Sequence, residues 1–209
     1  CYEQSLHGRL HNGEADYVRG SLSVGCCLGI PWYVDWAYDG PYGILSFVRN
    51  NVDRDGKYFE TSTGYSDHTN NLYLTFAEPL LNYRSDRYPR GINLYDDRQF
   101  QRFYVLPQLS FNCIGKEPRF GDSAPDQSRA YMPASLFSAF DNNMAYRLFS
   151  RCSSEEDRQR FASLLWYLNG DRAPETLIPR LELPWAVFHG EMLSAEPVPL
   201  DPVLSRKIH

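Results

Sequence analysis

Apolar residues recur at helical spacing along most of the chain, and this pattern predicts a mostly helical fold. The clearest example lies at 67–83, where apolar side chains come in pairs every four residues. Weaker versions of the pattern lie at 15–28 and 41–52, and Gly29 with Pro31 ends the first of them. The same periodicity predicts three more helices, at 97–109, 136–148 and 154–168.

The chain changes character beyond residue 173. Prolines become frequent there, and short apolar runs such as 185–188 suit strands. We therefore expect a helical domain at 1–173 and a proline-rich tail, or the start of a following domain, at 174–209. The expected fold is therefore all-α, with a few short strands near the C-terminus. Amphipathic helices joined by loops suit helical hairpins set in an arc or ring, but the topology does not follow from the pattern alone.

Charge and composition limit the classes of protein to which the chain can belong. A formal charge of −5 argues against broad nucleic-acid binding, which favours a positive surface. No run approaches the roughly 18 apolar residues of a membrane helix, so membrane insertion is not expected. The five cysteines are an odd number without CxxC spacing, so neither a zinc ribbon nor a dense disulfide framework is expected, and most are expected to be buried thiols.

Two polar segments stand directly before apolar helices, at junctions where catalytic residues are common. The segment 10–17 carries Asn12, and the segment 55–68 carries Tyr65. These two residues are too far apart in the sequence for local hydrogen bonding. Adjacent helical hairpins could nevertheless bring both of them to one shared cleft.

The two segments resemble the heparinase II/III family of polysaccharide lyases and its alginate-lyase relatives. In that family a glycine-containing turn, an extended segment with a Glu and a Tyr at a helix entrance follow one another. The Asp-Gly pair at 55–56, Glu60 and Tyr65 match this order. Asn12 is similar to the catalytic Asn that opens an upstream helix in the family, and Asp122 lies in a similar Gly-Asp loop.

The resemblance implies a function, a location and a partner domain. It implies a partial (α/α) toroid of helical hairpins that cleaves an acidic, uronate-containing polysaccharide by β-elimination, without a metal or a cofactor. It also implies a secreted or periplasmic protein, in which a β-sandwich domain follows the helical domain. The acidic polysaccharide is then the expected partner, with no nucleic acid and no membrane insertion.

The chemistry of β-elimination gives each residue of the resemblance a role. Asn12 would hydrogen-bond the uronate carboxylate and stabilise the negative charge that develops when the C5 proton leaves. Tyr65 would take that proton and return it to the departing glycosidic oxygen. Because a free phenol has a pKa of about 10, Tyr65 needs a nearby cation or hydrogen-bond donor, and His11 or His68 could supply it.

Further side chains are expected to bind the substrate, and each has a structural alternative. The candidates are Glu60, Trp32, Arg84, Arg87 and Asp122. The arginines could instead form a solvated face, and the tryptophan could pack in the core. Likewise Asn12 could serve only as a helix N-cap, and Tyr65 could be a capping or core residue.

Two other functions remain open from the sequence. A glycoside hydrolase on a similar toroid would need two carboxylates beside the scissile bond, drawn from Glu60, Asp67 and Asp122. A glycan-binding domain without activity is the third possibility. The reaction product separates them, since only a lyase forms an unsaturated uronate.

Overall fold

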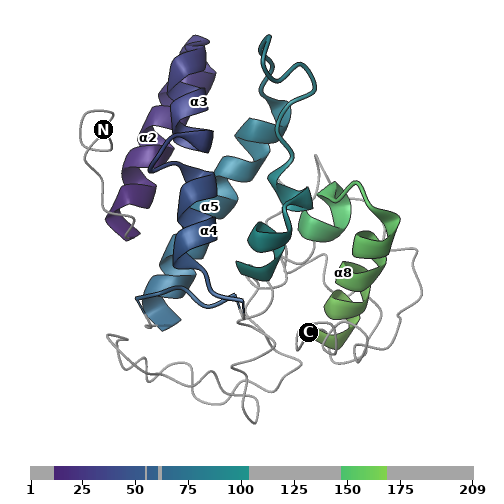
Figure 1. Cartoon of the computed structure of the whole chain (residues 1–209). Helices are drawn as coiled ribbons and strands as arrows, with labels where there is room; N and C mark the ends of the chain where they lie inside the picture. The colour runs from purple at the N-terminus through teal and green to yellow at the C-terminus, as the bar shows by residue number, and fades with distance from the viewer. Residues whose placement is uncertain (1–11, 55, 61–62, 104–146, 169–209) are drawn as a thin grey trace. The chain divides into compact units, whose positions relative to one another are not determined.

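The computed structural model describes residues 12–54, 56–60, 63–103 and 147–168 (Figure 1). These residues are 71% helical and contain no strand, so the all-α prediction is confirmed for this part of the chain. They belong to two compact units, one holding 12–103 and the other 147–168. The expected domain boundary at 173 and the expected strands near the C-terminus lie outside the described residues.

The first unit begins with a helical hairpin. Helix α2 spans Asn12–Leu28 and ends at Gly29, whose φ of 65° is the left-handed conformation that glycine adopts after a helix. The amide of Ile30 donates to the carbonyl of Gly25 at 2.9 Å, which closes the last turn. Helix α3, Pro31–Asp39, then begins with proline in its first turn and packs back against α2.

Helices α2 and α3 approach each other closely at Gly25. A methyl group at this position would lie 2.8 Å from Cγ2 of Val34 and 2.9 Å from Cβ of Tyr33. Gly25 is buried, as are Val34 and Ala37 of α3. The absence of a side chain at Gly25 therefore allows the hairpin to close.

The second pair of helices leads into the region of the predicted site. Helix α4 spans Ile44–Asn51, so it begins after Gly43 and not at Pro41 as the sequence pattern indicated. An isolated bridge joins Val52 and Tyr58 across the turn predicted at 53–56. Helix α5 spans Thr63–Asn82, starts four residues before its predicted beginning at 67, and contains Pro79.

The core of the first unit is aromatic. The ring of Tyr73 in α5 lies 4.6 Å from the ring of Phe47 in α4 and 5.1 Å from Phe76. Phe100 and Phe103, in a helical stretch at 98–103, lie 6.1 and 6.2 Å from the same tyrosine ring. All five rings are buried, which confirms a packing role for these aromatic residues.

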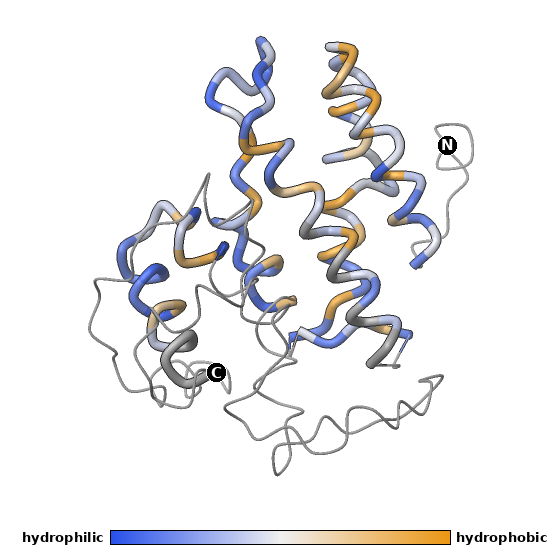
Figure 2. The backbone as a smooth tube through the Cα atoms, turned by 180° about the vertical axis from the view of Figure 1, so that it is seen from behind, coloured by the Kyte–Doolittle hydropathy of each residue, from blue (hydrophilic) through white to orange (hydrophobic). Residues whose placement is uncertain are grey.

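The directions of the helices determine which ends meet. Figures 1 and 2 show α2 and α5 running in the same general direction, so their N-terminal ends lie at the same end of the unit. The two helices also contact each other. After α5, the polar connection predicted at 84–93 leads to a short 3-10 helix, η1, at Leu94–Asp96.

The second unit shows one helix end that the sequence predicted. Helix α8 spans Glu155–Leu168, and the hydroxyl of Ser154 accepts a hydrogen bond from the Asp157 amide at 3.4 Å. Within the described ranges, no helix is both long and apolar enough to cross a lipid bilayer.

The cysteines differ from their predicted burial. Cys152 is buried, whereas Cys26 is half-buried and Cys27 is exposed, and all three are free thiols. Consecutive residues of a helix point in different directions, so Cys26 and Cys27 cannot both face the core. Cys1 and Cys113 lie outside the described residues.

Candidate functional site

The two helix entrances that the sequence indicated lie at the same end of the first unit. Asn12 is the first residue of α2 and is half-buried. Tyr65 is in the first turn of α5 and is also half-buried. Each side chain is therefore neither fully packed into the core nor fully in solvent.

Polar side chains are buried beneath these entrances. Tyr58, Thr69 and Tyr73 have no exposed surface, and one carboxylate oxygen of Glu60 is buried beside them. We call Tyr58, Glu60, Thr69 and Tyr73 the buried polar cluster. Both tyrosine rings stack on Phe47, with centroids 5.4 Å away for Tyr58 and 4.6 Å away for Tyr73, so Phe47 contacts both phenol rings.

The hydroxyl of Tyr58 lies at the centre of this cluster. Its neighbours are the carboxylate of Glu60, the hydroxyl of Thr69 and the backbone of Asn12. Burial, reinforced by the adjacent Glu60 carboxylate, raises the pKa of the Tyr58 phenol well above its usual value. Tyr58 therefore stays protonated and uncharged at neutral pH.

Tyr73 extends the cluster toward α2. Complete burial raises the pKa of its phenol well above 10, and the nearby Tyr58 and Glu14 raise it further. Glu14 belongs to the first turn of α2 and is only 5% exposed. A second carboxylate thus lies on the α2 side of the phenol pair.

The cluster contains polar atoms that the surrounding protein does not satisfy. Among the described residues, no hydrogen-bond partner of normal geometry exists for the Tyr58, Thr69 and Tyr73 hydroxyls or for Oε2 of Glu60. Leaving one such buried group unpaired costs about 1–3 kcal/mol. Unsatisfied buried groups are uncommon in folded proteins, so a concentration of them makes this cluster the candidate site.

The cluster connects the two predicted catalytic residues. Asn12 reaches it through its backbone, which lies beside the Tyr58 hydroxyl. Tyr65, Thr69 and Tyr73 succeed one another at four-residue intervals on α5, and residues at this spacing share one face of a helix. The structure therefore brings Asn12 and the Tyr65 face of α5 to the same cluster.

Of the remaining catalytic candidates, the structure describes only the side chain of His68. His68 is exposed on α5, three residues after Tyr65, a spacing at which helical side chains are neighbours. His11, Asp122 and the side chain of Asp67 lie outside the described part of the structure. Across the ranges that are described, no three His, Cys, Asp or Glu side chains are grouped so as to hold a metal ion.

Arg84 and Arg87 lie away from the two entrances. At about 1.5 Å per residue, the C-terminal end of α5 is roughly 25 Å from Tyr65, and both arginines follow that end. The guanidinium of Arg84 donates to the carbonyls of Leu81 and Tyr83, each at 2.8 Å. Arg84 thus caps the last turn of α5.

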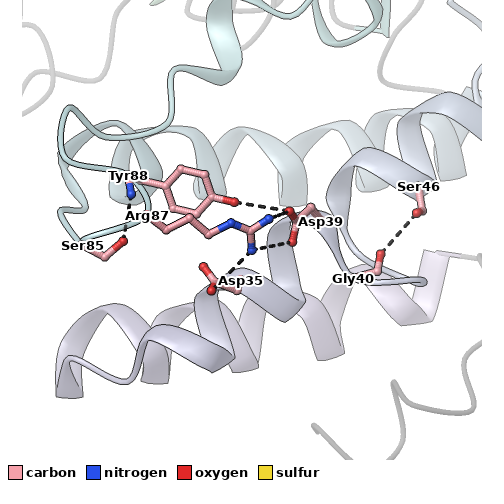
Figure 3. Close-up of polar contacts among 7 residues, drawn as sticks. All are labelled: Asp35, Asp39, Gly40, Ser46, Ser85, Arg87 and Tyr88. Atoms are coloured by element: carbon pink, nitrogen blue, oxygen red, sulfur yellow. Dashed lines mark hydrogen bonds and ion pairs between the residues drawn. The ribbon is translucent and has the colours of Figure 1, made fainter.

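Arg87 ties this connection to α3 (Figure 3). Its guanidinium forms ion pairs with Asp39 and, at 3.4 Å, with Asp35. The Tyr88 hydroxyl donates to Asp39 at 3.3 Å, and the Tyr88 amide donates to the hydroxyl of Ser85 at 3.1 Å. Arg87 is half exposed and is paired with two carboxylates, and its predicted contact with an acidic polymer stays a prediction.

Trp32 is not packed in the core, and its predicted contact with the substrate stays a prediction. It lies in the first turn of α3, beyond the C-terminal end of α2, whereas Asn12 is at the other end of α2. Half of its surface is exposed, and its ring stacks on Tyr33 with the centroids 4.0 Å apart. The structure therefore separates Trp32 from the buried polar cluster.

Comparison with known proteins adds no relative. No protein-family model matches the sequence, no curated protein matches it, and no solved structure matches it. The resemblance to the heparinase II/III family therefore stays a prediction that rests on the residues quoted for it.

Proposed function

We propose that this chain is the helical part of a polysaccharide lyase that cleaves a uronate-containing polymer by β-elimination. One observation carries the proposal: Asn12 and the Tyr65 face of α5 meet at a cluster of buried, unpaired polar groups. Perturbed and incompletely satisfied polar groups are typical of functional sites. The proposal also includes an (α/α) toroid, a following β-sandwich domain and a place outside the cytoplasm.

The proposed reaction uses one tyrosine as base and then as acid. Tyr65, deprotonated, takes the C5 proton of the uronate. The electron pair of that C–H bond forms the C4–C5 double bond, and the bond from C4 to the glycosidic oxygen breaks. Tyr65 then gives its proton to the departing oxygen, so the tyrosine returns to its deprotonated state for the next cycle.

Asn12 stabilises the charge that this reaction creates. Its side-chain amide donates to the uronate carboxylate, where negative charge accumulates as C5 loses its proton. Asn12 is the first residue of α2, and the partial positive charge at a helix N-terminus also favours an anion. Glu60, beside Tyr58, orients the segment that leads to Tyr65.

The tyrosine needs a neighbouring cation or hydrogen-bond donor, and the proposal gives this role to His68. His68 lies three residues from Tyr65 on α5, a spacing at which helical side chains are neighbours. Arg84 and Arg87 have intramolecular partners at the far end of α5, so the proposal does not depend on them.

A product screen tests the proposal. The full chain is incubated with alginate, hyaluronan, chondroitin sulfate and heparan sulfate, and the ultraviolet absorbance of an unsaturated uronate is followed. The matched control is Asn12→Ala, which removes the proposed carboxylate ligand and leaves Tyr65 in place. Absorbance that rises with the wild type and much more slowly with the variant supports the proposal, and no rise with any polymer rejects it.

A glycoside hydrolase is the second candidate, and one observation favours it. Two carboxylates approach the phenol pair, Glu60 beside Tyr58 and Glu14 beside Tyr73. Paired carboxylates are what most glycoside hydrolases require. New reducing ends without ultraviolet absorbance in the same screen would establish hydrolysis, and polymer binding with neither product would establish a glycan-binding domain.

A further inference from the structure

The unpaired hydroxyl of Tyr58 is placed between groups that could all bond to it. The Glu60 carboxylate can accept its proton, while the Thr69 hydroxyl and the Asn12 backbone amide can donate to its oxygen. In the described part of the structure none of these contacts has normal hydrogen-bond geometry. A small contraction of the site would therefore complete several hydrogen bonds together.

Catalytic hydrogen bonds are often long before substrate binds and tighten only in the complex. The backbone amide of Asn12 is one of the first amides of α2, which have no acceptor within the helix. A hydrogen bond from this amide to Tyr58 would fix the beginning of α2. It would thereby fix the position of Asn12 relative to Tyr65.

We propose that Tyr58 is a positioning residue for the reaction proposed above. Its hydroxyl closes hydrogen bonds to Glu60 and to the first turn of α2 when an acidic sugar binds, and this sets Asn12 in place. The inference rests on the proposed function. It adds a residue that does not touch the substrate and that acts through Asn12.

Removing the Tyr58 hydroxyl should lower the reaction rate without lowering the stability of the protein, whereas removing a hydrogen-bonded buried hydroxyl lowers stability. Tyr58→Phe keeps the ring stacked on Phe47 and removes only an unpaired oxygen. The melting temperature of the variant without polymer should therefore not fall below that of the wild type. Its kcat should fall about 10- to 100-fold, because a misplacement of about 1 Å can lower a rate by about 10²-fold.

The matched control is Tyr95→Phe. Tyr95 is equally buried, but its hydroxyl donates to Glu78 at 2.9 Å, remote from Asn12. This variant should be less stable than the wild type and should keep the kcat of the wild type per folded molecule. If Tyr58→Phe behaves in this way too, Tyr58 is a structural residue and the proposal is overturned.

Hydrogen exchange makes the test independent of turnover. In a Tyr65→Phe background, which binds without reacting, the four polymers of the screen are added one at a time and the amides of 12–16 are followed. A polymer that binds should slow their exchange, and adding Tyr58→Phe should abolish this protection. Unchanged protection in the double variant overturns the positioning role.

The two proposals fail in distinguishable ways. If the wild type binds a polymer but forms no unsaturated product, the lyase proposal fails, and the exchange of the α2 amides still decides the role of Tyr58. If none of the four polymers binds, both proposals fail. Product from the wild type, together with unaltered kcat in Tyr58→Phe, rejects the further inference alone.

Discussion

Replacing Tyr73 with Phe should make the protein more stable. The Tyr73 side chain has no exposed surface, and its hydroxyl has no hydrogen-bond partner among the described residues. Removing an unpaired buried hydroxyl relieves about 1–3 kcal/mol of desolvation. The space left by one oxygen, on the order of 10 Å³, costs only about 0.2 kcal/mol at about 24 cal/mol per Å³.

The ring contacts of Tyr73 do not change in this variant. Its centroid stays 4.6 Å from Phe47 and 5.1 Å from Phe76, so the aromatic packing is retained. The expected net effect is a gain of about 1–2 kcal/mol in the free energy of unfolding. Urea unfolding followed by circular dichroism measures it as a higher midpoint at an unchanged m value.

The same substitution at Tyr95 provides the comparison of opposite sign. The Tyr95 hydroxyl donates to Glu78 at 2.9 Å, and a hydrogen bond to a charged group stabilises by about 1.5–3 kcal/mol. Tyr95→Phe should therefore lower the midpoint. A comparable loss of stability in Tyr73→Phe would show that its hydroxyl is satisfied, and it would refute the reasoning that treats the buried polar cluster as unpaired.

Three further predictions concern the contact between α2 and α3, the raised pKa values of four tyrosines, and the role of Asn12. Gly25→Ala should lower the free energy of unfolding, measured in urea, by about 1 kcal/mol. The clash with α3 costs about 1–3 kcal/mol, which exceeds the gain of about 1 kcal/mol in helix propensity. The matched control is Ser23→Ala on the exposed face of α2, which should not lower the stability. The folded protein raises the pKa values of Tyr38, Tyr58, Tyr73 and Tyr88, so these phenols ionise first in the unfolded chain, at about pH 10. The free energy of unfolding should therefore decline as pH rises above about 10. A urea midpoint that stays constant between about pH 9 and 11 would contradict the raised pKa values. Asn12→Ala should raise KM and lower kcat for a uronate polymer, and kinetics equal to the wild type would remove Asn12 from the mechanism.

The helices were predictable where one physical signal dominated. Paired apolar positions predicted α5, and its core side chains Phe76 and Leu80 are buried as expected. The sequence pattern does not predict helix α3, because Gly29 and Pro31 indicate only the end of α2. Glycine after one helix and proline in the first turn of the next can stand together at the tip of a hairpin, as they do here.

The sequence predicts the two residues at the helix entrances, Asn12 and Tyr65, but not the buried polar cluster beneath them. Asn12 and Tyr65 could be chosen from the sequence because they stand at the entrances of apolar helices and because of the family resemblance. Tyr73 belongs to the apolar pattern of α5, so its sequence position predicted a core ring and nothing about an unpaired hydroxyl. The cluster depends on side chains of 58–60 and of α5 meeting in space beside the backbone of Asn12, and no local pattern in the sequence contains that information.

The central claim is that Tyr65 carries the proton, and Tyr65→Phe tests it most directly. The substitution keeps the ring and removes the only group of this side chain that can exchange a proton. On the polymer that the wild type cleaves, the rate of unsaturated uronate formation should fall by about 10²- to 10⁴-fold, while the urea midpoint and polymer binding change little. A folded variant that forms the product at nearly the wild-type rate would contradict the account, because another group would then be the base.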